Sequence, residues 1–259
     1  MQPIECNLRA NDGTLGWLTH VRDLPGIGGL AVQRMRVVFL GDSVTAGFGL
    51  SEHVDGVSYV QLLSARLADH PSSPELIASA WEGIDTSYAL KRFNRMVTAL
   101  DPDWVVILLG LNDAQPSGGR TATSPADYRS NLLALVDRVL ALGARPVLVA
   151  PGPRFRPADD DGRPMEIMGP YVAALRSVAE EGEFPWVDLH SPFTALEAVR
   201  ELLPDGVHPG PAGHTLIADI LAAELPCLWE EPNYSADDFV PSDEAPMGWP
   251  SGRGRPATE

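Results

Sequence analysis

An α/β fold built on a five-stranded parallel sheet is predicted by three features of the sequence. Short apolar runs alternate with segments in which apolar residues recur at helical spacing. Some of these runs are apolar at nearly every position, as expected for strands that are covered on both faces. Each run ends at a glycine or a polar loop, and the carboxyl ends of parallel strands share one edge of a sheet, where ligands bind. We therefore expect helices on both faces of the sheet, joined to the strands by right-handed crossovers.

The strands are predicted from the apolar runs. The clearest are VVFL, which begins at residue 37 and is followed by Gly41, and DWVVILL, which begins at residue 103 and is followed by Gly110. Both are rich in the β-branched residues that favour strands. The expected strands are residues 36–41, 75–81, 103–109, 145–150 and 185–189.

The helices are predicted from spacing and from end signals. Ser124 and Pro125 are typical of a helix start, as N-cap and first-turn residue, and Gly143 is typical of a helix end. The expected helices are residues 57–69, 86–100, 125–142, 167–180, 191–203 and 211–225.

Length and composition limit the organisation of the chain. Its 259 residues suit one domain with extensions, and no run approaches the ~18 apolar residues of a membrane span. We expect an irregular N-terminal extension (1–34), one domain (35–226) and a disordered acidic tail (227–259). The tail is poor in apolar residues and rich in proline and acidic residues.

Charge and cysteine content exclude some partners and favour one location. The net charge of −16 argues against nucleic acid and anionic membranes, because no basic stripe is available to neutralise phosphates. Cys6 and Cys227 do not make a disulfide framework, and the first residues lack a basic start followed by an apolar core. We expect a cytoplasmic protein, with no membrane insertion and an oligomeric state that the sequence leaves open.

Candidate site residues follow the first three strands, and two more stand before the last helix. Ser43 follows the first strand, Gly83 the second and Asn112 the third, while Asp205 and His208 lie in the loop before residue 211. A serine hydroxyl becomes a nucleophile when a base takes its proton, and a carboxylate can orient that base. His208 and Asp205 suit these roles. The backbone N–H groups of Ser43 and Gly83 and the amide of Asn112 suit an oxyanion hole.

Each of these residues also has a plain structural explanation. Ser43 suits a helix cap, Asn112 suits a turn, and Asp205 begins a common turn pair with Gly206. It is their order, each at a predicted strand end or in one facing loop, that favours acyl transfer. Asp113 is expected to stabilise its loop and His214 to be a surface or packing residue. A solvated loop, or alternatively an anion-binding lid, is expected for Arg154, Arg156 and Arg163.

Three motifs resemble those of the SGNH/GDSL hydrolase family. They are Gly41-Asp42-Ser43, Gly110-Leu111-Asn112-Asp113 and Asp205-Gly206-Val207-His208-Pro209.

The resemblance implies a flavodoxin-like three-layer α/β/α sandwich. It further implies Ser43 as nucleophile, His208 and Asp205 as its partners, and Asn112 as an oxyanion donor. The second family motif is altered here, because Gly83 is the only glycine in residues 79–86. The backbone N–H of Asp85 or Thr86 is therefore an alternative to that of Gly83.

These observations predict a serine esterase that acts on a small-molecule ester through an acyl-serine intermediate, without a metal or organic cofactor. Residues 113–123 and 151–166 are expected to frame the pocket. Neither loop contains a long apolar segment, which favours a short acyl group. A thioesterase or acyltransferase of the same fold is one alternative. A catalytically silent ligand-binding domain is the other, suggested by the altered second motif.

Overall fold

The computed structural model describes residues 34–50, 56–115, 121–155, 167–196 and 199–230. Within them five parallel strands form one sheet in the order β2-β1-β3-β4-β5. The predicted parallel sheet is thus confirmed, and the first and fourth strands have the predicted bounds. The strands are β1 (Arg36–Gly41), β2 (Glu75–Ala80), β3 (Trp104–Leu108), β4 (Arg145–Ala150) and β5 (Trp186–Asp188).

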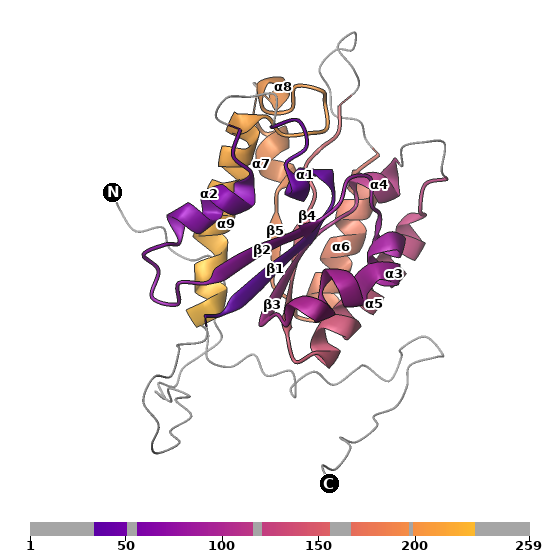
Figure 1. The fold of residues 1–259 in the computed structure, drawn as a ribbon. Helices are drawn as coiled ribbons and strands as arrows, with labels where there is room; N and C mark the ends of the chain where they lie inside the picture. Colours follow the sequence, from indigo (N-terminus) through magenta and orange to yellow (C-terminus); the bar gives the residue numbers. More distant parts are fainter. Residues whose placement is uncertain (1–33, 51–55, 116–120, 156–166, 197–198, 231–259) are drawn as a thin grey trace, which may run out of the picture.

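Helices cover both faces of the sheet, so the predicted three-layer α/β/α class is also confirmed (Figure 1). Helices α3, α5 and α6 lie on one side, and α2 and α9 pack against each other on the opposite side. The helices are α1 (Ser43–Ala46), α2 (Tyr59–Arg66), α3 (Thr86–Met96), the 3₁₀ helix η2 (Thr98–Leu100), α4 (Leu111–Ala114), α5 (Pro125–Ala141), α6 (Gly169–Glu181), α7 (His190–Thr194), α8 (Val199–Leu202) and α9 (Pro211–Glu230).

The centre of the core is formed by β1 and β3. All four residues of the VVFL run are at most 1% exposed, and all five residues of β3 are buried. Burying one such side chain contributes about 1.5–3 kcal/mol, so these two strands hold the sheet in place. Because α1 and α4 follow them directly, the carboxyl ends of the most firmly packed strands carry the candidate site.

Two predicted helices are interrupted. The helix expected at 86–100 ends at Met96, because Val97 leaves the helical conformation (φ −127°, ψ −62°), and η2 then ends in the left-handed turn of Asp101. The helix expected at 191–203 is replaced by the short helices α7 and α8, and residues 197–198 between them lie outside the described part. Apolar spacing continues across both breaks, so it did not reveal them.

The last helix runs past its predicted end. It continues to Glu230 and contains Pro226 in its interior. Leu228 and Trp229 are partly buried against the core. Residues 227–230, where the sequence predicts the start of the acidic tail, thus continue α9. The predicted tail residues from 231 onward, and residues 1–33 of the predicted extension, lie outside the described residues.

None of the described helices combines the length and the apolar character that crossing a membrane requires.

Candidate active site

The turn between β1 and α1 places Ser43 at the edge of the sheet. A Cβ atom on Gly41 would lie 2.0 Å from Oγ1 of Thr45, so only glycine allows α1 to fold back over the end of β1. The carboxylate of Asp42 caps the helix by accepting a hydrogen bond of 3.0 Å from the N–H of Val44. Ser43 is the first residue of α1 and is 7% exposed.

Ser43, His208 and Asp205 form one chain of hydrogen bonds. Oγ of Ser43 lies 2.9 Å from Nε2 of His208, although the two residues are 165 positions apart. Nδ1 of His208 lies 2.6 Å from Oδ2 of Asp205. The other carboxylate oxygen accepts the N–H groups of Val207 and His208 at 2.9 and 2.7 Å. One carboxylate thus fixes both the loop and the orientation of the imidazole.

The charge of Asp205 determines which nitrogen of His208 carries the proton. Partial burial raises the pKa of Asp205, but the hydrogen bonds from the His208 ring and from the His208 and Val207 amides outweigh burial and leave that pKa below its ordinary value. An ionised Asp205 can only accept a hydrogen bond, so Nδ1 of His208 carries the hydrogen and donates it. Nε2 is then left as the acceptor that faces the hydroxyl of Ser43.

Asn112 reaches the same place from the next strand. It lies in α4, after β3, is 9% exposed, and donates from Nδ2 to Oδ2 of Asp42 at 3.3 Å. An amide NH₂ group carries two hydrogens, so the second can be directed at a ligand. Burial raises the pKa of Asp42 to about 6, against the opposing effects of the Val44 N–H and the charge of His208. No separate role is predicted for Asp42 from the sequence, although the residue stands within the first motif.

The loop after β2 is held by Asp113. Its buried carboxylate accepts the Thr86 hydroxyl at 2.5 Å and the Thr86 N–H at 3.1 Å, so its predicted role as a loop stabiliser is confirmed. Burial raises the pKa of Asp113 to about 6, while the bonds from Thr86 lower it. The Thr86 N–H, which the sequence offered as an alternative to that of Gly83, is thus bonded to Asp113. Gly83 itself lies in the left-handed region at φ 71°.

His214 is a packing residue, one of the two roles expected for it. It is fully buried, its Nδ1 accepts the N–H of Tyr59 at 3.1 Å, and its ring stacks on that of Tyr59. Burial, together with the charge of His208, lowers the pKa of His214 to about 4. The hydroxyl of Tyr59 in turn lies 2.9 Å from Oγ1 of Thr45, in the helix that carries Ser43.

Arg154 differs from the solvated arginine that was predicted. It is partly buried, its Nη1 donates to the carbonyl oxygen of Leu111 at 3.5 Å, and it lies close enough to Asp205 and Asp42 for their charges to raise its pKa against the larger effect of burial. Its cation therefore lies beside the candidate site. Arg156 and Arg163 lie outside the described residues.

Phe48 also lies at the site, although no motif in the sequence includes it. The centroid of its ring lies 4.4 Å from that of the His208 ring, and the residue is 43% exposed. Its position five residues after Ser43 is the only signal in the sequence, and helical spacing alone does not place it beside a residue 160 positions later.

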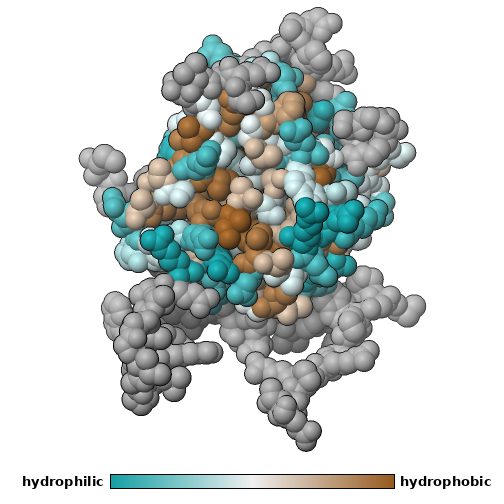
Figure 2. Space-filling view, in the orientation of Figure 1, coloured by the Kyte–Doolittle hydropathy of each residue, from teal (hydrophilic) through white to brown (hydrophobic). Residues whose placement is uncertain are grey.

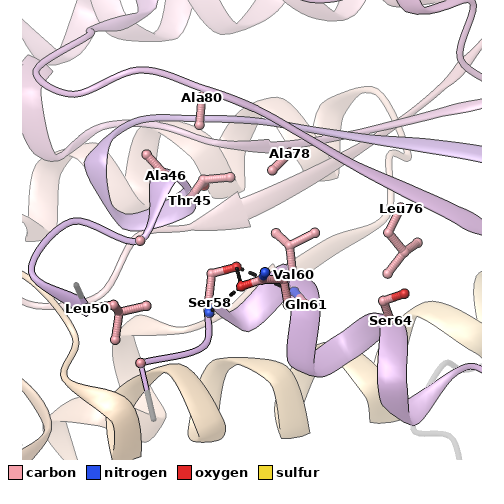
Figure 3. A pocket seen from close by; sticks show the side chains of 12 residues that line it. Thr45, Ala46, Leu50, Ser58, Val60, Gln61, Ser64, Leu76, Ala78 and Ala80 are labelled. Carbon is pink, nitrogen blue, oxygen red and sulfur yellow. Dashed lines mark hydrogen bonds between the residues drawn. The ribbon is translucent and has the colours of Figure 1, made fainter. Parts of the chain in front are cut away.

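A large groove lies next to the site but does not include it (Figure 3). Its volume is about 770 Å³, and it runs between the edge strand β2 and helix α2 up to α1. Figure 2 shows apolar surface gathered on the face where β2 lies. Neither Ser43 nor His208 lines this groove. A second cavity, of about 20 Å³, is bordered by Asp42, Leu111 and Val207.

No cluster of three or more histidine, cysteine or acidic side chains suited to a metal ion occurs among the described residues.

Comparison with known proteins identifies the family. The model of the GDSL-like lipase/acylhydrolase family matches residues 39–216. The chain is 27% identical to an acetylxylan esterase of Geobacillus stearothermophilus, over 75% of this chain and 95% of the relative. It is 25% identical to an arylesterase of Vibrio mimicus, over 73% of this chain and 88% of the relative.

A solved structure gives the same assignment. The lipase/acylhydrolase of Enterococcus faecalis is 28% identical and superposes with a TM-score of 0.62, covering 75% of this chain and 96% of its own. The matched residues 39–216 include all three sequence motifs and most of the described sheet. The chain therefore belongs to the GDSL-like lipase/acylhydrolase family and is an ester hydrolase.

Proposed function

We propose that the protein is a serine esterase in which Ser43 is the nucleophile, His208 the general base and acid, and Asp205 the residue that orients His208. The observation that carries the proposal is the 2.9 Å separation between Oγ of Ser43 and Nε2 of His208, with Asp205 on the other ring nitrogen. This is the distance at which a base can take the hydroxyl proton.

The reaction has two halves. Oγ of Ser43 attacks the acyl carbon as its proton passes to Nε2 of His208. The resulting oxyanion accepts the N–H of Ser43, the amide of Asn112 and an N–H of the loop that contains Gly83. The C–O bond to the alcohol then breaks, and the alcohol oxygen takes the proton from Nε2. Water, deprotonated by the same nitrogen, hydrolyses the acyl-serine and restores the hydroxyl.

A short acyl group, such as acetyl, fits this site best. The cavity that borders Asp42, Leu111 and Val207 measures about 20 Å³, and the large groove is lined by neither Ser43 nor His208. Neither of these described cavities offers a long apolar tunnel at Ser43. One of the relatives cited above is named as an acetylxylan esterase, which supports an acetyl ester as the substrate.

The proposal is tested with acyl esters of one chromogenic alcohol, from acetyl to long-chain. Turnover should be highest for the short esters. Ser43→Ala and His208→Ala should each lower kcat by at least about 10⁴-fold, and Asp205→Ala by less, because nucleophile and base act as a unit. Ser130→Ala, which alters an exposed serine on α5, should behave like the wild type. Full activity in the Ser43→Ala variant would exclude the mechanism.

A further inference from the structure

The end of helix α1 fixes the position of Phe48 relative to Ser43. The N–H of Phe48 donates to the carbonyl oxygen of Ser43 at 2.9 Å, and the N–H of Gly47 donates to that of Val44 at 3.2 Å. Gly47 lies in the left-handed region at φ 77°, which completes the hydrogen-bond pattern of a Schellman motif. The backbone of Phe48 is therefore tied to the turn that carries the proposed nucleophile.

The ring of Phe48 lies against His208 but is not buried by it. The two rings are tilted by 44° with centroids 4.4 Å apart, and Phe48 remains 43% exposed. Core aromatic residues such as Phe39 and Phe93 are at most 2% exposed. Phe48 therefore keeps apolar surface accessible while its ring contacts the imidazole, so a ligand in the space beside His208 can reach it.

That space is where the alcohol part of an ester must lie. In the proposed reaction the leaving oxygen takes its proton from Nε2 of His208, so the two atoms come within about 2.6–3.2 Å of each other. The acyl carbon is bonded to Oγ of Ser43 at that moment. The alcohol therefore extends from the imidazole toward the side chains around it. Within the part of the chain that the structure describes, the exposed aromatic ring in contact with His208 is that of Phe48.

We propose that Phe48 is a specificity-determining residue that packs against the alcohol part of the substrate and favours alcohols with a flat or ring-shaped apolar face, such as phenols and pyranosides. An aromatic ring packs on another ring in an offset or edge-to-face arrangement, which a flat alcohol allows. This inference rests on the proposed function, because it uses His208 as the proton donor to the leaving group.

The test compares acetate esters that share the acyl group and differ in the alcohol. Phenyl acetate, a mono-acetylated methyl pyranoside and ethyl acetate are suitable. Phe48→Ala should lower kcat/KM about tenfold for the two ring alcohols and less than about twofold for ethyl acetate. Phe48→Leu retains apolar bulk next to His208 without a flat face, and it should show the same selective loss.

The structural alternative is that Phe48 only holds His208 in place. His208 acts on every ester, so in that case both variants would lose activity by the same factor on all three acetates, and the inference would be overturned. It would also be overturned by unchanged kinetics on all three. A series of phenyl esters with different acyl groups gives a second check, because Phe48→Ala should lower kcat/KM by one common factor along that series.

Controls separate this inference from the proposed function. Leu142, 40% exposed, follows α5 and lies just before β4, at the amino ends of the strands and so away from the site. Leu142→Ala should leave the ratios of kcat/KM between the three acetates unchanged. If the wild type turns over acetates and Ser43→Ala does not, the proposed function stands whatever the Phe48 variants do. If Ser43→Ala matches the wild type, the proposed function itself has failed, and the inference fails with it.

Discussion

Asn112 has its side chain held in advance of catalysis. One hydrogen of its amide is bonded to Asp42, the residue before Ser43, so the amide cannot rotate freely. A donor that is already oriented loses little entropy when charge develops on the substrate oxygen, which is the condition for strong transition-state stabilisation. The pair Asp42–Asn112 therefore joins the ends of β1 and β3 at the point where we place the oxyanion.

Asn112→Ala removes that donor and should lower kcat by about 10²–10³-fold with little change in KM, since the lost interaction strengthens only in the transition state. Steady-state kinetics on a short acyl ester measures both constants. Asn94→Ala, an exposed asparagine on α3, is the matched control and should be neutral. A rise in KM at constant kcat would instead assign Asn112 to ground-state binding.

At the scale of an element, the position of α1 depends on close contact with β1. The helix has four residues, too few to be stable alone, and it is held by the cap of Asp42 and by the fit between Gly41 and Thr45. Its far side is held by a hydrogen bond between the hydroxyls of Thr45 and Tyr59, which belongs to α2. The N–H of Tyr59 in turn donates to Nδ1 of His214 in α9. Three elements thus fix one turn of helix.

Gly41→Ala should therefore displace α1 and reduce both stability and activity. The added Cβ would meet Thr45 at 2.0–2.5 Å, and such overpacking costs about 1–3 kcal/mol. Urea unfolding measures the stability, and ester turnover measures the displacement of Ser43. The control is Gly169→Ala, at the start of α6, where the new Cβ would meet nothing within 4 Å. Equal effects of the two substitutions would contradict this account of α1.

At the scale of the whole molecule, three buried groups make stability depend on pH in opposite directions. Burial lowers the pKa of His214 from its ordinary 6.5 to about 4, so the folded chain favours the neutral imidazole. The contribution of His214 to stability is therefore fully present above pH 6.5 and is lost as the pH falls toward 4. Asp42 and Asp113 titrate near 6 against an ordinary 3.8. Their contributions are present below pH 3.8 and are lost as the pH rises through 6.

His214→Gln isolates one of these contributions. Protonation of His214 would turn Nδ1 into a donor facing the N–H of Tyr59, and glutamine avoids this change. Between pH 7.5 and 5.5 the free energy of unfolding of the wild type should fall by about 1 kcal/mol relative to the variant. Urea unfolding at the two pH values measures this difference. The difference between wild type and Ser130→Ala should be constant. A constant difference for His214→Gln as well would show that His214 does not titrate as described.

The sequence is enough to predict the parallel sheet and the strand ends at which Ser43 and Asn112 stand, because continuous apolar runs and their alternation with helices are local patterns. It also determined the pairing of Asp205 with His208, since three residues of loop bring the two side chains together. Boundaries were less well determined, as the breaks at Val97 and after Thr194 show.

Which distant groups meet depends on tertiary packing. The order of the strands and the packing of α9 bring His208 to Ser43 across 165 residues, place Phe48 against the imidazole and leave Arg154, partly buried, beside two carboxylates. Tertiary packing also brings the Thr86 N–H to the carboxylate of Asp113 and buries His214. These contacts depend on how whole elements pack, and the spacing of residues within one element carries no information about its partners.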